Sequence, residues 1–147
     1  MGKYYESEFL KWQETYGKYR EEKGIENVRV ILTGCFGLCS KGPIVIIRPD
    51  DTFYSHVKPE DCQEIIEKHI LGGEKVQRLL CKDVDGKIYE RLDDLPFYKK
   101  QLRIALKNCG VINPENIEEY IAFDGFKALE KVLTSMTQDE VIQEILD

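Results

Sequence analysis

Thr33-Gly34-Cys35-Phe36-Gly37-Leu38-Cys39-Ser40-Lys41-Gly42-Pro43 places two cysteines in one short loop. An apolar run over 28–32 precedes this loop, and a second apolar run over 44–47 follows it. The loop's three glycines permit turns that a Cβ would obstruct and bring backbone amides close to the sulfurs. Loops built in this way commonly bind metals through thiolates, so the pattern predicts Cys35 and Cys39 as metal ligands.

The residues around the loop predict an α/β fold. Aromatic side chains recur at three- and four-residue steps over residues 4–23, which is typical of an amphipathic helix that ends at Gly24. We expect this aromatic stripe to form part of the core. Apolar and β-branched runs predict strands over 28–32, 43–47 and 52–57. The last two are expected to form an antiparallel hairpin, and a helix opening at Pro59 completes the layer near residue 82.

The chain beyond residue 82 has a different character. Residues 83–100 are polar and rich in turn-forming residues, which indicates a linker. A short strand is predicted over Leu102–Leu106, and three helices follow from residue 113 onward. Thr137-Gln138-Asp139-Glu140 is a capping sequence for the last of these helices. We therefore expect a domain over 1–82, a linker over 83–100, and a small helical segment over 101–147.

Composition limits the classes of function. The 147 residues carry 21 Lys and Arg against 27 Asp and Glu, so nucleic acid is not an expected partner. The apolar runs are too short for a membrane span, and the N-terminus lacks the apolar core of a signal peptide. The five cysteines are irregularly spaced, which argues against a secreted disulfide framework. These features predict a cytoplasmic protein.

Further residues extend the pattern of the cysteine loop. They are the strand over 44–47 after Gly42-Pro43, then Tyr54, then the helix start Val57-Lys58-Pro59-Glu60-Asp61. With these residues, the stretch from 27 to 83 resembles the thioredoxin-like [2Fe-2S] ferredoxins. Residues 96–117, which include Arg103-Ile104-Ala105-Leu106-Lys107-Asn108-Cys109-Gly110, look like the entry to the FMN-binding subunit of NADH dehydrogenases and bifurcating hydrogenases. In those subunits a ferredoxin domain precedes the flavin domain.

The sequence also departs from this family. The family has a first strand and a first pair of cysteines before its long helix, and this sequence begins with the helix. The chain contains no glycine-rich phosphate-binding run. The resemblance therefore implies a thioredoxin-like ferredoxin layer without its first strand, with Cys35 and Cys39 as two of four cluster ligands. It implies FMN and NAD(P) only in a larger parent subunit, so 101–147 would lead into a flavin domain and the chain would not be catalytic by itself.

Two functions follow from this resemblance. In the first, the chain is an electron-transfer module of a multi-subunit NAD(P)-linked oxidoreductase, and it carries or shares a [2Fe-2S] cluster. The other two ligands would come from a second copy in a homodimer, from another subunit, or from a preceding segment. In the second, the chain is a structural or docking module without a cluster, and its two cysteines are free thiols.

Other assignments of the cysteines and histidines carry less weight. A zinc site could combine Cys35 and Cys39 with one histidine, but the sequence lacks a second matched cysteine pair. Thiol–disulfide exchange favours two residues between the cysteines and a following helix, whereas three residues and a strand are predicted here. Three further cysteines are expected to be structural: Cys62, Cys81 and Cys109. His69 is expected to be a partly buried residue with satisfied hydrogen bonds.

Overall fold

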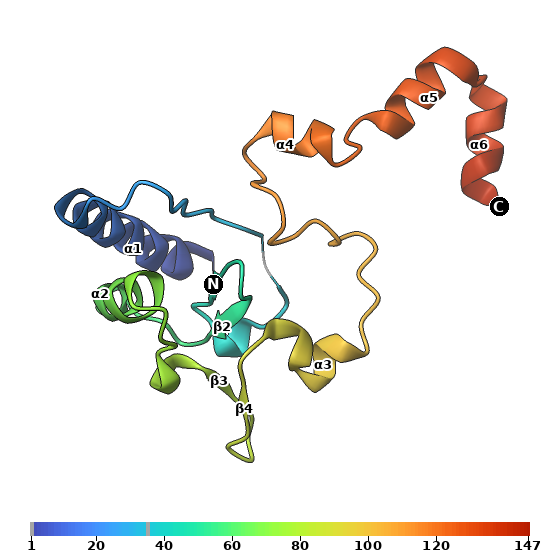
Figure 1. The fold of residues 1–147 in the computed structure, drawn as a ribbon. Coiled ribbons are helices and arrows are strands. Elements are labelled where there is room, and N and C mark those ends of the chain that lie inside the picture. The colour runs from blue at the N-terminus through green and yellow to red at the C-terminus, as the bar shows by residue number, and fades with distance from the viewer. Residues whose placement is uncertain (1, 35) are drawn as a thin grey trace. The chain divides into compact units, whose positions relative to one another are not determined.

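The computed structural model describes the backbone of residues 2–34 and 36–147, and the side chains of residues 10–34 and 36–147. The chain forms two compact units (Figure 1). The first unit comprises Met1–Ile31 and Cys35–Lys107, and the second comprises Leu32–Gly34 and Asn108–Asp147. Both units differ in extent from the domains predicted from the sequence, because residues beyond position 82 belong to the first unit.

Helix α1 spans Gly2–Lys23 and confirms the predicted N-terminal helix. Trp12 and Tyr16 are buried, and their rings stack with centroids 5.8 Å apart. Gly24 follows with a φ of +62°, the left-handed conformation in which many helices end. The described part of the aromatic stripe therefore lies in the core, and Tyr16 also donates a hydrogen bond to the Val28 carbonyl at 3.0 Å.

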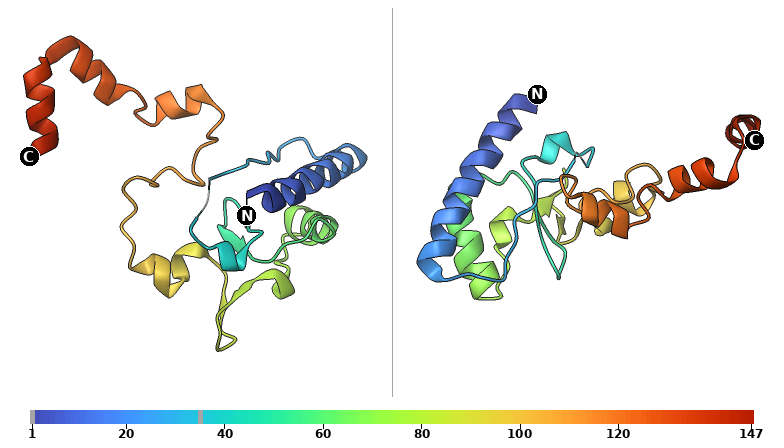
Figure 2. Two further views of the ribbon diagram at one scale, coloured as in Figure 1. Left: turned by 180° about the vertical axis from the view of Figure 1, so that it is seen from behind. Right: turned by 90° about the horizontal axis from the view of Figure 1, so that it is seen from above.

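The predicted hairpin is present. Strand β1, Val45–Ile47, pairs antiparallel with β2, Thr52–Tyr54, and Val45 lies opposite Tyr54. Helix α2, Asp61–Glu64, continues into the π-helical η2, Ile65–Leu71. This helix lies beside α1 (Figures 1 and 2) and buries Ile65 and Ile66 in the core that includes Trp12. These elements confirm the predicted α/β class.

The strand predicted over 28–32 does not form, and this expectation was wrong. Residues 25–34 are irregular, although Val28 and Val30 are half-buried against the core of the first unit. An extended segment becomes a strand only when a neighbouring strand completes its ladder of hydrogen bonds. In the described part of the chain, no strand pairs with this segment. Apolar burial alone therefore orders it without making it part of a sheet.

Residues 83–100, where the sequence indicates a linker, contain structured elements. Strand β3, Cys81–Lys82, pairs antiparallel with β4, Ile88–Tyr89. The 3₁₀ helix η4, Leu92–Asp94, and helix α3, Pro96–Lys99, follow. These elements contribute to a second core, whose buried members are Phe53, Cys81, Tyr89, Leu92, Leu95 and Tyr98. The sequence signal failed because apolar residues are sparse here and their partners are distant in the chain.

The second unit consists of helices with largely exposed apolar side chains. Helices α4, Ile117–Ala122, α5, Lys127–Ser135, and α6, Gln138–Leu146, confirm the three predicted helices. Thr137 and Glu140 form the predicted capping box at the start of α6. The strand predicted over 102–106, within the first unit, is absent, and these residues form a bend and turns with Leu102 and Ile104 exposed.

None of the helices in the described ranges combines the length and the apolar composition that a bilayer crossing demands.

Candidate metal centre

The second cysteine of the loop lies in a short, exposed turn. The 3₁₀ helix η1 spans Cys39–Lys41, and Cys39 is exposed at its start. Phe36 and Leu38, which precede it, are half-buried against the second core of the first unit. The Tyr98 hydroxyl donates a hydrogen bond to the Phe36 carbonyl. The loop is therefore anchored by its apolar residues, while Cys39 faces solvent. Cys35, the other predicted ligand, lies outside the described residues.

His56 fastens η1 to the end of strand β2. Its backbone N–H donates to the Lys41 carbonyl at 2.9 Å, and its Nε2 lies 3.1 Å from the Ser40 carbonyl oxygen. The backbone of His56 has a φ of +55°, in the left-handed region that residues other than glycine seldom adopt. Such backbone conformations persist only where surrounding contacts impose them. The two hydrogen bonds from His56 to η1 supply such contacts.

The cysteines differ sharply in environment. Cys62 lies on α2 and Cys81 on β3, and both thiols are free and buried. Burial raises the pKa of the Cys62 thiol to about 12. Burial also raises the pKa of Cys81, against opposing effects of Lys41 and Ser55. The thiolate is the form that binds metal and attacks electrophiles, and a raised pKa disfavours it. Cys62 and Cys81 are therefore packing residues, as the sequence predicts.

We expect an alkylating reagent to modify Cys39 well before Cys62 in native protein kept under reducing conditions. Cys39 is exposed, whereas Cys62 is fully buried and its thiol stays protonated near neutral pH. Peptide mass spectrometry after brief treatment with iodoacetamide would measure the order of modification. Denatured protein provides the control, because Cys62 should react there as readily as Cys39. Rapid labelling of Cys62 in the native protein would contradict the described packing.

His69 has the satisfied, buried environment predicted for it. Its Nδ1 lies 2.8 Å from the Tyr54 hydroxyl, and its Nε2 lies 3.1 Å from Oδ2 of Asp50. Both ring nitrogens are therefore occupied by protein groups. Among the described residues, no three His, Cys, Asp or Glu side chains are grouped to hold a metal ion. The zinc arrangement that includes Cys35 stays a prediction, because that residue lies outside the described ranges.

Cys109 belongs to the second unit and contacts the segment Leu32–Gly34 of the same unit. Its thiol donates to the Gly34 carbonyl at 3.3 Å, and both residues are members of that unit. A thiol that serves as a donor to a backbone carbonyl has a role in packing. This arrangement supports the structural role expected of Cys109 from the sequence.

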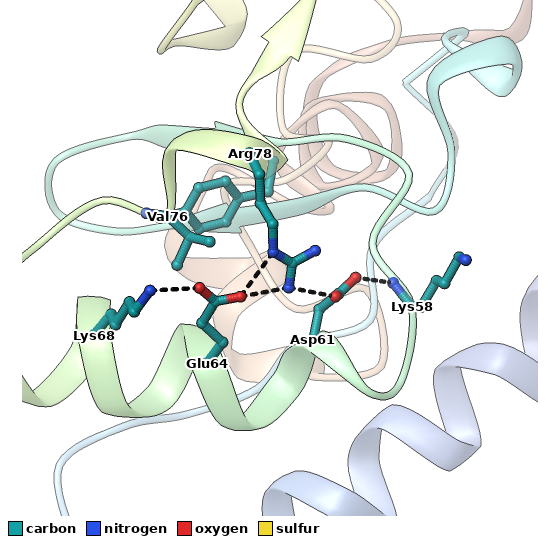
Figure 3. Close-up of polar contacts among 7 residues, drawn as sticks. Lys58, Asp61, Glu64, Lys68, Val76 and Arg78 are labelled. Atoms are coloured by element: carbon teal, nitrogen blue, oxygen red, sulfur yellow. Dashed lines mark hydrogen bonds and ion pairs between the residues drawn. The ribbon is translucent and has the colours of Figure 1, made fainter.

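A cluster of charged residues that the sequence did not reveal lies on α2, on η2 and on the 3₁₀ helix η3, Gln77–Leu79. Arg78 donates to Oδ1 of Asp61 at 2.6 Å and, through Nε, to Oε2 of Glu64 at 2.8 Å (Figure 3). Asp61 also accepts from the Lys58 backbone N–H at 2.8 Å, and Lys68 pairs with Glu64 at 2.7 Å. These residues are scattered in sequence, so no local motif marks the cluster.

Comparisons with known proteins show similarity to two ferredoxins. No protein-family model matches the chain. Over 48 residues it is 54% identical to a 2Fe-2S ferredoxin of Aquifex aeolicus, a match that covers 33% of this chain and 43% of that protein. A 2Fe-2S ferredoxin of Clostridium pasteurianum is 52% identical over 52 residues, which cover 35% of this chain and 51% of that protein. Over about a third of its length, the chain is therefore similar in sequence to 2Fe-2S ferredoxins.

Part of the chain is also similar to a hydrogenase subunit. It is 61% identical over 44 residues to the NADP-reducing hydrogenase subunit HndC of Solidesulfovibrio fructosivorans, covering 30% of this chain and 9% of that subunit. The solved thioredoxin-like [2Fe-2S] ferredoxin of Aquifex aeolicus is 37% identical, with 52% of this chain and 76% of that chain covered and a TM-score of 0.38. The chain spans about half the length of the curated ferredoxins it matches.

Proposed function

We propose that this chain is an electron-transfer module in which Cys35 and Cys39 supply two thiolates to a [2Fe-2S] cluster. The observation that carries the proposal is the exposed Cys39, in a turn held by the half-buried Phe36 and Leu38 and by hydrogen bonds between His56 and the two residues after the cysteine. Thiolates are the usual ligands of such clusters. The 54% identity to a 2Fe-2S ferredoxin supports the same chemistry.

The exposed Cys39, together with Cys35 from outside the described residues, would fit one side of a cluster. Four ligands are needed, and the loop provides two of them. Cys62 and Cys81 are fully buried in the two cores, and the Cys109 thiol is hydrogen-bonded to the Gly34 carbonyl. We therefore propose that the other two thiolates come from a second copy of the chain, another subunit or a preceding segment. When bound, the cluster would accept and donate single electrons, while the protein holds the thiolates in place.

We further propose a larger setting, in which the chain works with other subunits of a cytoplasmic NAD(P)-linked oxidoreductase. The similarity to the hydrogenase subunit HndC supports this setting. In this proposal FMN and NAD(P) are bound by other parts of the complex or by a larger parent subunit. The chain itself relays electrons and does not turn over NADH.

Iron and sulfide content tests the cluster directly. We expect anaerobically reconstituted protein to bind iron and acid-labile sulfide and to show the visible absorption of a [2Fe-2S] centre. If two copies share one cluster through two thiolates each, iron should amount to about one atom per chain, and the protein should be dimeric. Cys39→Ala should reduce bound iron to background, because one of the two thiolates of the loop is lost. Metal analysis and absorption spectroscopy are the measurements.

The matched variant is Cys109→Ala, which removes a thiol by the same chemical change outside the cysteine loop. It should retain the iron of the unaltered protein. Protein that stays colourless after reconstitution in the presence of its partner subunits would contradict cluster binding. Under that outcome the alternative from the sequence, a docking module without a cluster, would account for the fold.

A further inference from the structure

A pocket of about 340 Å³ lies where the end of β2, the start of α2 and the β3 segment meet. Its lining includes His56 and the charged residues Lys58, Asp61, Arg78 and Lys82. Lys58 and Lys82 are both exposed, and neither ammonium group forms an ion pair with a described residue. The pocket therefore has two cationic groups in its lining that are not paired with a carboxylate in the described part of the chain.

The one carboxylate of the lining is already engaged. Asp61 accepts from the Lys58 backbone N–H and from Arg78, at 2.8 Å and 2.6 Å (Figure 3). Its ion-pair partner is therefore Arg78 and neither of the two lysine side chains. Lys41 adds a further positive charge, because its ammonium group donates to the Lys82 carbonyl. The lining carries three cationic side chains, Lys58, Arg78 and Lys82, against the one carboxylate of Asp61, on a chain whose net charge is −6.

The pocket adjoins the cysteine turn through His56. This residue lines the pocket and bonds to both Ser40 and Lys41 of η1. A ligand held by Lys58 and Lys82 would therefore lie beside the turn that begins at Cys39. Positive surface on an otherwise acidic protein attracts and orients negatively charged partners, and this effect acts on the rate of association as well as on specificity.

We propose that this cationic pocket docks an acidic segment of a partner protein beside the cysteine turn. Flexible, exposed lysines suit a carboxylate-rich protein surface, whereas a small anion is usually held by more rigid and more buried donors. The purpose of the docking, delivery of a redox partner to Cys39, rests on the proposed function. The binding itself does not require a cluster.

A short oligoglutamate peptide, titrated into the isotope-labelled full chain, tests the proposal. We expect saturable NMR shifts of the amides around Ser55, Lys58 and Lys82, and weaker binding as salt is raised. The double variant Lys58→Glu/Lys82→Glu should bind the peptide at least about tenfold more weakly, since attraction is replaced by repulsion. Both lysines are exposed, so the variant should unfold at the same temperature as the unaltered protein.

The control is Lys18→Glu/Lys99→Glu, which changes the net charge equally at exposed sites that do not line the pocket. It should retain most of the affinity. Absence of binding, indifference to the pocket substitutions, or an equal loss in the control would each overturn the proposal. Peptide binding by protein that never acquires iron would uphold the docking surface while refuting the cluster, so the two proposals fail separately.

Discussion

Replacing Trp12 with alanine is expected to lower the free energy of unfolding by about 3–5 kcal/mol. Trp12 is only 9% exposed, belongs to the core shared by α1 and η2, and stacks on Tyr16. Its removal would leave a cavity beside Ile65 and Ile66. Helix α1 could move only partly into that space, because its other core contacts hold it in place. Denaturant unfolding followed by circular dichroism would measure the loss.

Two further substitutions distinguish packing from helix propensity. Leu10→Ala lies on the same helix, but Leu10 is 53% exposed, so its effect should stay within about 0.5 kcal/mol. Trp12→Phe should cost less than Trp12→Ala, because an aromatic ring is kept and the buried indole N–H, which has no hydrogen-bond partner among the described residues, is removed. Equal losses for Trp12→Ala and Leu10→Ala would show that the stripe is not buried.

Tyr54→Phe is the second substitution expected to have a large effect. The Tyr54 hydroxyl accepts from the Val76 backbone N–H at 2.9 Å, so its proton points to Nδ1 of His69 at 2.8 Å. His69 then carries its proton on Nε2, which donates to Asp50 at 3.1 Å. Phenylalanine would leave the Val76 N–H and His69 Nδ1 unsatisfied, at about 1–3 kcal/mol for each group that stays buried.

Denaturant unfolding measures this loss, and Tyr120→Phe is the matched control because Tyr120 is exposed on α4. The same network acts on Asp50. Burial raises the pKa of that carboxyl, but hydrogen bonds from Thr52 and His69, with the electrostatic effect of His69, bring it below its ordinary value. If Tyr54→Phe lowered the free energy of unfolding by less than about 0.5 kcal/mol, the size typical of surface substitutions, the buried hydrogen-bond network around Tyr54 would be contradicted.

Local patterns predicted the elements that local chemistry specifies. Helix α1 follows from its aromatic spacing, its end from Gly24, and the start of α6 from the Thr137 capping box. The β1–β2 hairpin follows from two apolar runs separated by a Pro-Asp turn. In each case the residues that decide the conformation lie within a few positions of one another.

Features that depend on distant partners escaped the sequence. The segment over 28–32 has the composition of a strand, yet strand formation depends on a neighbour that its own residues do not reveal. Residues 83–100 have few apolar side chains, but Tyr89, Leu92, Leu95 and Tyr98 meet Phe53 and Cys81 from earlier in the chain. The π-helical turn of η2 also has no marker in the sequence that we recognised.

The candidate site was predictable in part. The cysteine loop could be located from its glycines, and the buried Cys62 and Cys81 from the apolar patterns around them. The tie between His56 and η1 could not, because residues 15 or more positions apart meet only after the hairpin folds. The pocket of Lys58, Arg78 and Lys82 was missed for the same reason.

The left-handed backbone of His56 has a mechanical consequence for the cysteine turn. Glycine at this position would relax the backbone but would lose the ring that reaches the Ser40 carbonyl. The residues on either side, Ser55 and Val57, are buried, so the tether begins in the interior of the molecule. The turn that bears Cys39 is therefore held in place by the hairpin through His56. We expect its backbone to move little when the charge at the sulfur changes.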